Sequence, residues 1–365
     1  MLGKLTSYAI QFAEDGWLPD NCVRLGIQGL LRQRLRQSAR GNSSQSNATH
    51  DFADRMRNSP LLESAVEANQ QHYEVPAEFF RHILGKHMKY SCGFWESAAT
   101  TLDQAEEAML KLTCQRAAIE DGMRILELGC GWGSLSLWLA DHFPRSQVVA
   151  VSNSNSQRKF IESQSKSRGL ANLQVLTRNV AEFESTDLFD RILSVEMFEH
   201  FRNHAILLER ISGWLTTTGK LFVHVFCHHQ TPYCFEVNSP GDWMARHFFT
   251  GGIMPSAGLL NEYDEHLYVE RQWNVNGTHY SQTCEAWLQN LDSVYNELLK
   301  LFTKETDQAT ARLRLQRWRM FFLACSELFR FDNGNQWYVA HYVMGHNHQE
   351  GLQLLTERHP AIRTS

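Results

Sequence analysis

The stretch that decides the fold reads ILELGCGWGSLS and spans residues 125–136. Two β-forming residues and an acid lead into three glycines at alternate positions, and an apolar helical pattern follows at Leu135, Leu137 and Leu139. This order predicts a strand, a tight turn and the N-terminus of a helix. Glycine allows a positive φ and lets a ligand lie directly on the main chain, so the turn is a candidate binding loop.

The spacing of the glycines narrows the class of ligand. The pattern is G-x-G-x-G, whereas dinucleotide sites use G-x-G-x-x-G, and no Gly-Lys-Ser/Thr of a phosphate-binding loop follows. A loop that holds one nucleoside is therefore favoured. In α/β folds, an acid followed by such glycines after the first strand is the usual site of S-adenosylmethionine (SAM). The alternative is a glycine-rich turn without a ligand.

Strands and helices alternate after residue 121. The apolar pattern predicts strands at 124–128, 147–152, 174–177, 189–195 and 220–226, and helices at 134–142, 155–168 and about 203–215. Such alternation predicts an α/β fold with a parallel sheet covered by helices. Ligands of these sheets bind outside the carboxyl ends of the strands.

The chain is expected to divide into four parts. Residues 1–58 have helical periodicity with a polar linker near 41–49, and residues 59–120 form a second helical segment. Residues 121–283 form the core, in which Asn276-Gly277 predicts a hairpin between strands at 268–274 and 278–281. Residues 284–365 are expected to form a helical cap with a polar tail.

Composition and charge limit the partners. The net charge of −5 makes nucleic acid an unfavourable partner, and no uninterrupted apolar run reaches about 18 residues, so no membrane span is predicted. Eight cysteines are spread singly without a C-x-x-C pair, which indicates reduced thiols in a cytoplasmic enzyme and no zinc site. No metal is expected elsewhere. A homodimer is left open.

The strand predicted at 189–195 ends in a cluster of ionisable residues. Glu196, Glu199 and His200 follow it within five positions, and burying them unpaired is costly. Glu196 and His200 are four apart, so on a helical turn they share a face. Such a pair can take a proton from a substrate amine, with the carboxylate orienting the imidazole. The alternative is a helix cap and a structural histidine.

Further candidates lie elsewhere in the chain. His224 is the only polar side chain in the strand segment 221–226, and aromatic and histidine residues crowd the insert at 228–252. Aromatic faces beside acids bind a cationic amine or a sulfonium, although aromatic residues are also common in cores. Cys92 is a candidate nucleophile, but a buried thiol is the more usual interpretation.

Several segments together resemble the coclaurine N-methyltransferase group, a branch of the cyclopropane fatty acid synthase superfamily. The resemblance covers roughly residues 60–345, in order and with short gaps, so it is more specific than the glycine loop. The segments that carry it are 71–76, 84–91, 126–136, 194–200, 222–228, 248–256, 275–280 and 337–341.

The resemblance implies a Rossmann-like class I methyltransferase sheet with a helical N-terminal extension and a helical cap. The segment 59–120 then contributes to the SAM site. Most methyltransferases place an acid at the end of the second strand to bind the ribose, but this superfamily resembles the present chain in using neutral groups there. The residues expected to bind SAM are Tyr90, Ser91, Glu127, Gly129, Gly131, Asn153 and Gln157.

The superfamily divides at the fourth strand. The cyclopropane synthases that this chain resembles bind bicarbonate through a cysteine, a glutamate, a histidine and a tyrosine. The bound bicarbonate serves to take a proton from a carbocation. The matching positions here are Cys92, Glu199, His224 and Tyr280. Glu196 stands where those enzymes have glycine, and it fits the amine methyltransferases, whose glutamate and following histidine contact the substrate nitrogen.

The resulting hypothesis is SAM-dependent N-methylation of an amine on an aromatic, tetrahydroisoquinoline-like small molecule, with S-adenosylhomocysteine (SAH) as the second product. Glu196 binds the ammonium and His200 accepts its proton, with Glu199 as a third catalytic residue. Carbon methylation of unsaturated lipid acyl chains is the first rival, and a SAM-binding scaffold is the second. The residues expected to bind the substrate are His224, Trp243, Phe248, Phe249, Tyr280 and Phe329.

Overall fold

A seven-stranded sheet forms the centre of the computed structural model, which describes residues 2–41, 45–62 and 75–347. The strand order is β3-β2-β1-β4-β5-β9-β8. The first five strands are parallel, and β9 pairs antiparallel with β5 and β8, so the expected α/β fold is confirmed. The strands are β1 Arg124–Leu128, β2 Gln147–Ser152, β3 Leu173–Thr177, β4 Phe189–Val195, β5 Leu215–His228, β8 Leu267–Val275 and β9 Trp337–His346.

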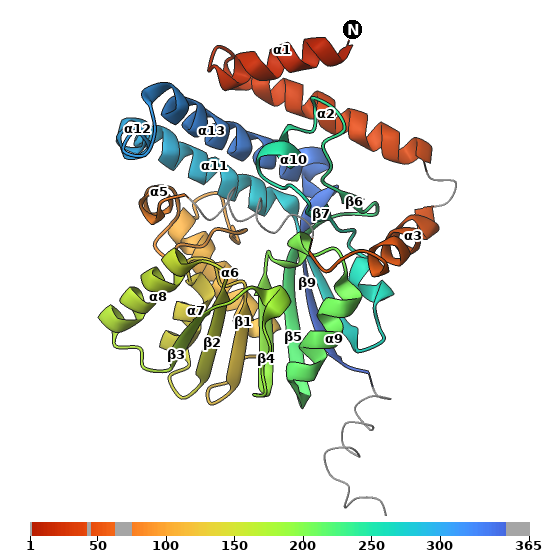
Figure 1. Ribbon diagram of the computed structural model, residues 1–365, viewed down its shortest axis with the longest axis vertical. Coiled ribbons are helices and arrows are strands. Elements are labelled where there is room, and N and C mark those ends of the chain that lie inside the picture. The colour runs from red at the N-terminus through yellow and green to blue at the C-terminus, as the bar shows by residue number, and fades with distance from the viewer. Residues whose placement is uncertain (1, 42–44, 63–74, 348–365) are drawn as a thin grey trace, which may run out of the picture.

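Helices cover both faces of the sheet and its carboxyl edge (Figure 1). The carboxyl-terminal halves of β1, β4 and β5 are largely buried and mostly apolar, because both faces of the sheet are covered there. A two-stranded ribbon of β6 Tyr233–Cys234 and β7 Ile253–Met254 frames the insert that contains α10. The helices are α5 Ala77–Ile83, α6 Leu102–Arg116, α7 Ser134–His142, α8 Asn155–Arg168, α9 His204–Trp214, α10 Trp243–His247, α11 Gly277–Ser293, α12 Tyr295–Phe302 and α13 Gln308–Arg330.

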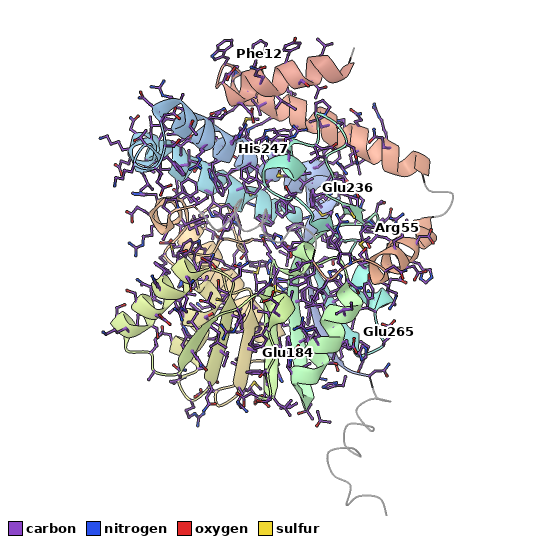
Figure 2. The ribbon with its side chains drawn as sticks, viewed as in Figure 1. Phe12, Arg55, Glu184, Glu236, His247 and Glu265 are labelled. Atoms are coloured by element: carbon purple, nitrogen blue, oxygen red, sulfur yellow. The ribbon has the colours of Figure 1, made fainter. Side chains whose placement is uncertain are left out.

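Two of the three N-terminal helices, α1 Leu2–Glu14 and α2 Asp20–Gly41, pack on the cap helix α13. The third, α3 Gln45–Arg57, packs on α9 and on the turn Leu259–Glu262. Arg24 of α2 bonds Glu285 at 2.6 Å and Glu327 at 2.9 Å, which ties α2 to α11 and α13. Side chains fill the space between these layers, and Phe12 lies on the outer face of α1 (Figure 2). The interval 41–49, expected as a linker, contains the end of α2 and the start of α3.

The predicted hairpin at Asn276-Gly277 is wrong. Asn276 is the N-cap of α11, and its side-chain oxygen accepts the Thr278 amide at 2.9 Å. A Cβ on Gly277 would lie 2.1 Å from the Trp337 carbonyl oxygen and 2.3 Å from that of Phe329. Asn276 therefore caps a helix, and Gly277 allows the backbone to pass close to two other segments. Both are further uses of the residue types that favour turns.

The end of the described chain returns to the sheet. β9 follows α13 and inserts between β5 and β8, where a helical cap with a polar tail was expected after residue 284. All ten residues of β9 are buried, so it lacks the alternation that marks a half-exposed strand. Residues 71–74 of the resemblance and the expected polar tail beyond residue 347 lie outside the described residues.

Candidate active site

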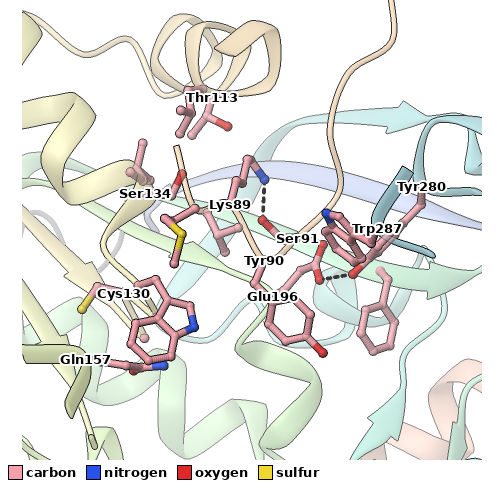
Figure 3. A pocket seen from close by; sticks show the side chains of 18 of the residues that line it. Lys89, Tyr90, Ser91, Thr113, Cys130, Ser134, Gln157, Glu196, Tyr280 and Trp287 are labelled. Atoms are coloured by element: carbon pink, nitrogen blue, oxygen red, sulfur yellow. Dashed lines mark hydrogen bonds between the residues drawn. The ribbon is translucent and has the colours of Figure 1, made fainter. Parts of the chain in front are cut away.

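A cavity lies where the carboxyl ends of β1 and β4 meet the helical cap (Figure 3). Most of its lining comes from the segment before α6, the loops after β1 and β4, and the helices α11 and α13. The helices α6 and α8, the strand β5 and the insert that contains α10 add further residues. The predicted site residues among its lining are Tyr90, Ser91, Glu127, Gly129, Gly131, Gln157, Glu196, His200, Phe249 and Tyr280. Those outside its lining are Asn153, Glu199, His224, Trp243, Phe248 and Phe329.

The glycine loop forms the floor on the β1 side. Gly129 has a φ of +76°, and a Cβ there would lie 3.0 Å from Met197 Cγ. A side chain at this position would therefore be strained and crowded. At the end of β1, the Ser136 hydroxyl donates to the Glu127 carboxylate. Burial raises the pKa of Glu127 to about 7 despite this hydrogen bond.

The segment before α6 places a buried cation beside the cavity. Lys89 is 3% exposed, and its ammonium donates to the Ser91 hydroxyl and, at 2.9 Å, to the Cys92 carbonyl (Figure 3). Burial lowers the pKa of Lys89. Tyr90 lies with its ring 5.4 Å from that of Trp287 on α11. Residues 88–91 of this segment thus line the cavity together with the glycine loop.

The two neutral residues after β2 have different positions. Gln157 is 2% exposed and lines the cavity, and its side-chain oxygen accepts the Ser152 hydroxyl at 2.7 Å. Asn153 is exposed and lies outside the lining. Of the two ribose candidates, Gln157 is therefore the one with a fixed place at the cavity.

Three donors surround the carboxylate of Glu196, at the end of β4. The Cys92 amide donates to Oε1 at 2.9 Å, and His224 Nε2 lies 3.2 Å from the same oxygen. The Tyr280 hydroxyl donates to Oε2 at 2.5 Å (Figure 3). Burial raises the pKa of Glu196, whereas the charge of Lys89 and the hydrogen bonds from Tyr280 and the Cys92 amide favour its charged form. The φ of +48° at Glu196 is a strained conformation of the kind that gathers at functional sites.

The two other ionisable residues of this turn have different environments. His200 lines the cavity, and its ring stacks on Phe249 with centroids 5.9 Å apart. Glu199 is fully buried and lies outside the lining. Burial, together with the nearby charge of Glu196, raises the pKa of Glu199 well above its ordinary value, which favours a neutral acid. Of these three ionisable residues, only Glu196 and His200 therefore face the cavity.

The predicted aromatic residues fall into an inner and an outer layer. Phe249 faces the cavity, whereas Phe248 stacks behind Phe321 at 4.2 Å, and Phe329 stacks behind Tyr280 at 4.3 Å. Trp243 donates its indole N–H to Glu14 of α1 at 2.9 Å. The outer layer supports the wall, since aromatic stacking fixes the rings that face the cavity.

Sequence reasoning missed several residues of this region. Lys89 was not among the expected site residues, although it directly precedes two residues expected to bind SAM. The aromatic lining residues Trp132, Phe226, Trp287 and Phe321 looked like ordinary core positions. Arg116 and His341 are far from Glu196 in the sequence, and hydrogen bonds link them to its carboxylate only in the folded structure.

The residues around the cavity fit SAM. The glycine loop admits close approach of a ligand to the main chain, and Glu127 and Gln157 present polar groups at the ends of β1 and β2. Tyr90 and Ser91 line the same cavity. In the described ranges, no group of three His, Cys, Asp or Glu could hold a metal ion. No helix among them is long and apolar enough to cross a membrane. Fold and site define a SAM-dependent methyltransferase.

Comparison with known proteins identifies the family. The model of the mycolic acid cyclopropane synthetase family matches residues 62–339. The (S)-coclaurine N-methyltransferase of Thalictrum flavum subsp. glaucum is 36% identical over 339 residues, covering 90% of this chain and 93% of that protein. The cyclopropane-fatty-acyl-phospholipid synthase of Escherichia coli (strain K12) is 26% identical, with 89% and 80% coverage.

A solved structure agrees with this result. The crystal structure of coclaurine N-methyltransferase bound to N-methylheliamine and SAH superimposes with a TM-score of 0.87 at 30% identity, covering 94% of this chain and 99% of that one. The chain therefore belongs to the mycolic acid cyclopropane synthetase family, in its coclaurine N-methyltransferase-like branch. The expected cofactor, SAM, is confirmed with it.

Proposed function

We propose that this methyltransferase acts on the nitrogen of a primary or secondary amine on an aromatic, tetrahydroisoquinoline-like small molecule. The observation that carries the proposal is the carboxylate of Glu196, oriented by three donors at the edge of the cavity. Its side chain is 11% exposed, so a ligand in the cavity can reach it. The relatives named for N-methylation of coclaurine support this choice of acceptor.

The chemistry requires a neutral nitrogen. An amine carries a proton at neutral pH, and in that state it has no lone pair with which to attack. Glu196 binds the incoming ammonium ion, and His200 accepts one proton from it. SAM supplies an electrophilic methyl group and leaves as SAH. After proton loss, the nitrogen lone pair forms the new bond to carbon, and the protein contributes mainly alignment and a fixed carboxylate.

The aromatic part of the substrate has a matching wall. Phe226, Phe249 and Trp287 line the cavity near His200 and Glu196. Ring faces beside a carboxylate suit an aromatic cation, because they combine apolar contact with cation–π attraction. Phe248, Phe329 and Trp243 take supporting places behind this wall.

Carbon methylation of unsaturated lipid is the second candidate function. The four positions that resemble the bicarbonate ligands of cyclopropane synthases, Cys92, Glu199, His224 and Tyr280, are all present. In this chain, however, donors from three of these positions are directed to the Glu196 carboxylate. A side chain thus takes the donors that an added anion would need, which favours nitrogen as the acceptor.

Two incubations separate these functions. The protein is supplied with SAM and either tetrahydroisoquinoline-type amines or vesicles of unsaturated phospholipid, with and without bicarbonate. N-methylamine formation that does not depend on bicarbonate supports the proposal. Lipid that gains a methylene group, with no methylated amine, refutes it.

Three further points stay predictions. All eight cysteines are free thiols, which supports a reducing, cytoplasmic compartment. A homodimer and the four-part division of the chain are kept as proposals. The first is tested by the mass of the protein in solution, and the second by limited proteolysis near residues 41–49.

A further inference from the structure

A chain of hydrogen bonds runs from α6 through two buried histidines to Glu196. Arg116 Nη1 lies 2.8 Å from His341 Nδ1, His341 Nε2 lies 2.9 Å from His224 Nδ1, and His224 Nε2 lies 3.2 Å from Glu196 Oε1. Both histidine side chains are 0% exposed. The chain joins the end of α6 to β9, β5 and the turn after β4, and neither Arg116 nor His341 lines the cavity.

The chemistry of arginine fixes the direction of every bond in this chain. A guanidinium has only donors and stays charged, so Nδ1 of His341 must be an acceptor. The proton of neutral His341 is then on Nε2, which donates to His224 Nδ1. By the same reasoning His224 carries its proton on Nε2 and donates to Glu196. Burial lowers the pKa of both histidines well below the ordinary value, in agreement with two neutral rings.

We propose that Arg116 and His341 are positioning residues that fix His224 as a hydrogen-bond donor and so hold Glu196 ionised and oriented for the substrate ammonium. This inference rests on the proposed function. It also removes His224 as a proton acceptor, because one ring nitrogen carries the proton and the other already accepts from His341.

The chain supports the carboxylate without covering it. A direct ion pair with arginine would occupy the Glu196 oxygens with a bidentate contact. Here the arginine stays at a distance, held over the Trp273 ring of β8 at 5.1 Å, and its influence passes through two neutral rings. Each ring presents one donor to the next acceptor, and aligned dipoles of this kind strengthen one another in a buried site.

Several other groups also face Glu196. They are Lys89 and Cys92 before α6, Glu199 and His200 in the turn after β4, His224 on β5, and Tyr280 and Cys284 on α11. Replacing Arg116 or His341 leaves these groups in place, but His224 is no longer fixed as a donor to the charged form of Glu196. The pKa of Glu196 then rises, and the acid limb of the activity profile moves to higher pH.

The decisive variants are a matched pair at His341. In His341→Gln, the amide oxygen can accept from Arg116 while the amide N–H donates to His224, so the direction is kept. In His341→Leu, both functions are lost at similar volume. We expect kcat/KM for tetrahydroisoquinoline to fall about tenfold in the leucine variant, with the acid limb raised by about half a pH unit or more. The glutamine variant should stay within about threefold of the wild type.

Arginine variants test the other end of the chain. Arg116→Met should reproduce the leucine variant, and Arg116→Lys should restore most of the activity, because lysine is also a donor-only cation. Arg124→Met is the matched control: Arg124 also lies over an aromatic ring, that of Phe189, but it pairs with Asp187 at the other end of β1. Its pH profile should not change.

A measurement without substrate decides the direction of the bonds. ¹⁵N NMR of histidine-labelled protein should show His224 and His341 as neutral Nε2–H tautomers, assigned by comparison with His341→Gln. A proton on His224 Nδ1, or equal pH profiles for His341→Gln and His341→Leu, would overturn the proposal. If no variant methylates an amine, the wild type included, the proposed function fails, and the positioning role fails with it even if the tautomers are as expected.

Discussion

Replacing Glu196 by glutamine removes the charge of the carboxylate and keeps its shape. Cys92 N–H and His224 both bond Oε1, which glutamine retains as an amide oxygen. The Tyr280 hydroxyl faces Oε2, which becomes an amide nitrogen, and the hydroxyl can rotate to accept from it. The hydrogen bonds around the residue can therefore be kept, and a loss of activity can be assigned to the charge.

The expected size of the loss follows from the interaction that is removed. A hydrogen bond to a charged partner is worth about 1.5–3 kcal/mol, and each 1.36 kcal/mol is a factor of ten, so kcat/KM should fall by about 10- to 160-fold. The thermal stability of the variant, in contrast to its kcat/KM, should not fall. The folded-state pKa of Glu196 is raised, so its stabilising contribution is present at low pH and is lost as pH rises through that pKa. Above that range, Glu196→Gln should melt at the same temperature or higher.

The assay is N-methyl product formation from tetrahydroisoquinoline at saturating SAM, with thermal melting of the same samples. Glu327→Gln is the matched control, since Glu327 is 1% exposed and paired with Arg24 but does not line the cavity. It should lower the melting temperature and leave kcat/KM close to wild type. Unchanged kcat/KM in Glu196→Gln would show that the charge of Glu196 has no role in the reaction, and a loss that merely follows unfolding would leave no loss to assign to the charge.

Three further predictions concern single residues. Tyr280→Phe removes the donor to Glu196 Oε2, so kcat/KM should fall about tenfold and the acid limb should move to higher pH, which a pH profile measures; an unmoved limb would exclude this contact. Glu127 has its pKa raised from 4.5 to about 7, so its stabilising contribution is complete at low pH and lost as pH rises through about 7. Without SAM, Glu127→Gln should therefore gain up to about 3 kcal/mol relative to wild type between about pH 5 and pH 8, measured by denaturant unfolding, and a constant difference would contradict this pKa. Gly129→Ala places a Cβ 3.0 Å from Met197 Cγ at a φ of +76°, so it should weaken SAM binding in calorimetry and cost about 1–2 kcal/mol of stability; wild-type affinity would show that the loop has room.

The parts of the fold that could be predicted depend on local patterns. The strands and helices between residues 124 and 214 follow from apolar runs and turns that recur within a few residues, and the structure confirms them. β9 could not be found in this way, because its position between β5 and β8 is decided by pairing with distant strands. Asn276-Gly277 shows the converse: a strong local turn signal was overruled by a helix and by contact with the backbone of Trp337.

The candidate site shows the same limit. Glu196 and His200 were visible because they are close in sequence and follow a predicted strand. Arg116, His341 and His224 come from α6, β9 and β5, which are far apart in the sequence, and only the packing of this helix on the sheet brings them together. Sequence also cannot separate a ring that faces a cavity from one stacked behind it, as Phe249 and Phe248 illustrate.

The central claim is that the Glu196 carboxylate selects nitrogen as the methyl acceptor. Its most direct test is a crystal structure of the full chain with SAH and a tetrahydroisoquinoline amine. We expect the amine nitrogen within hydrogen-bond distance of a Glu196 carboxylate oxygen, with the rings against Phe249 and Trp287. A nitrogen that faces away from both Glu196 and His200, or an added anion bound by Cys92, His224 and Tyr280 with Glu196 displaced, would contradict it.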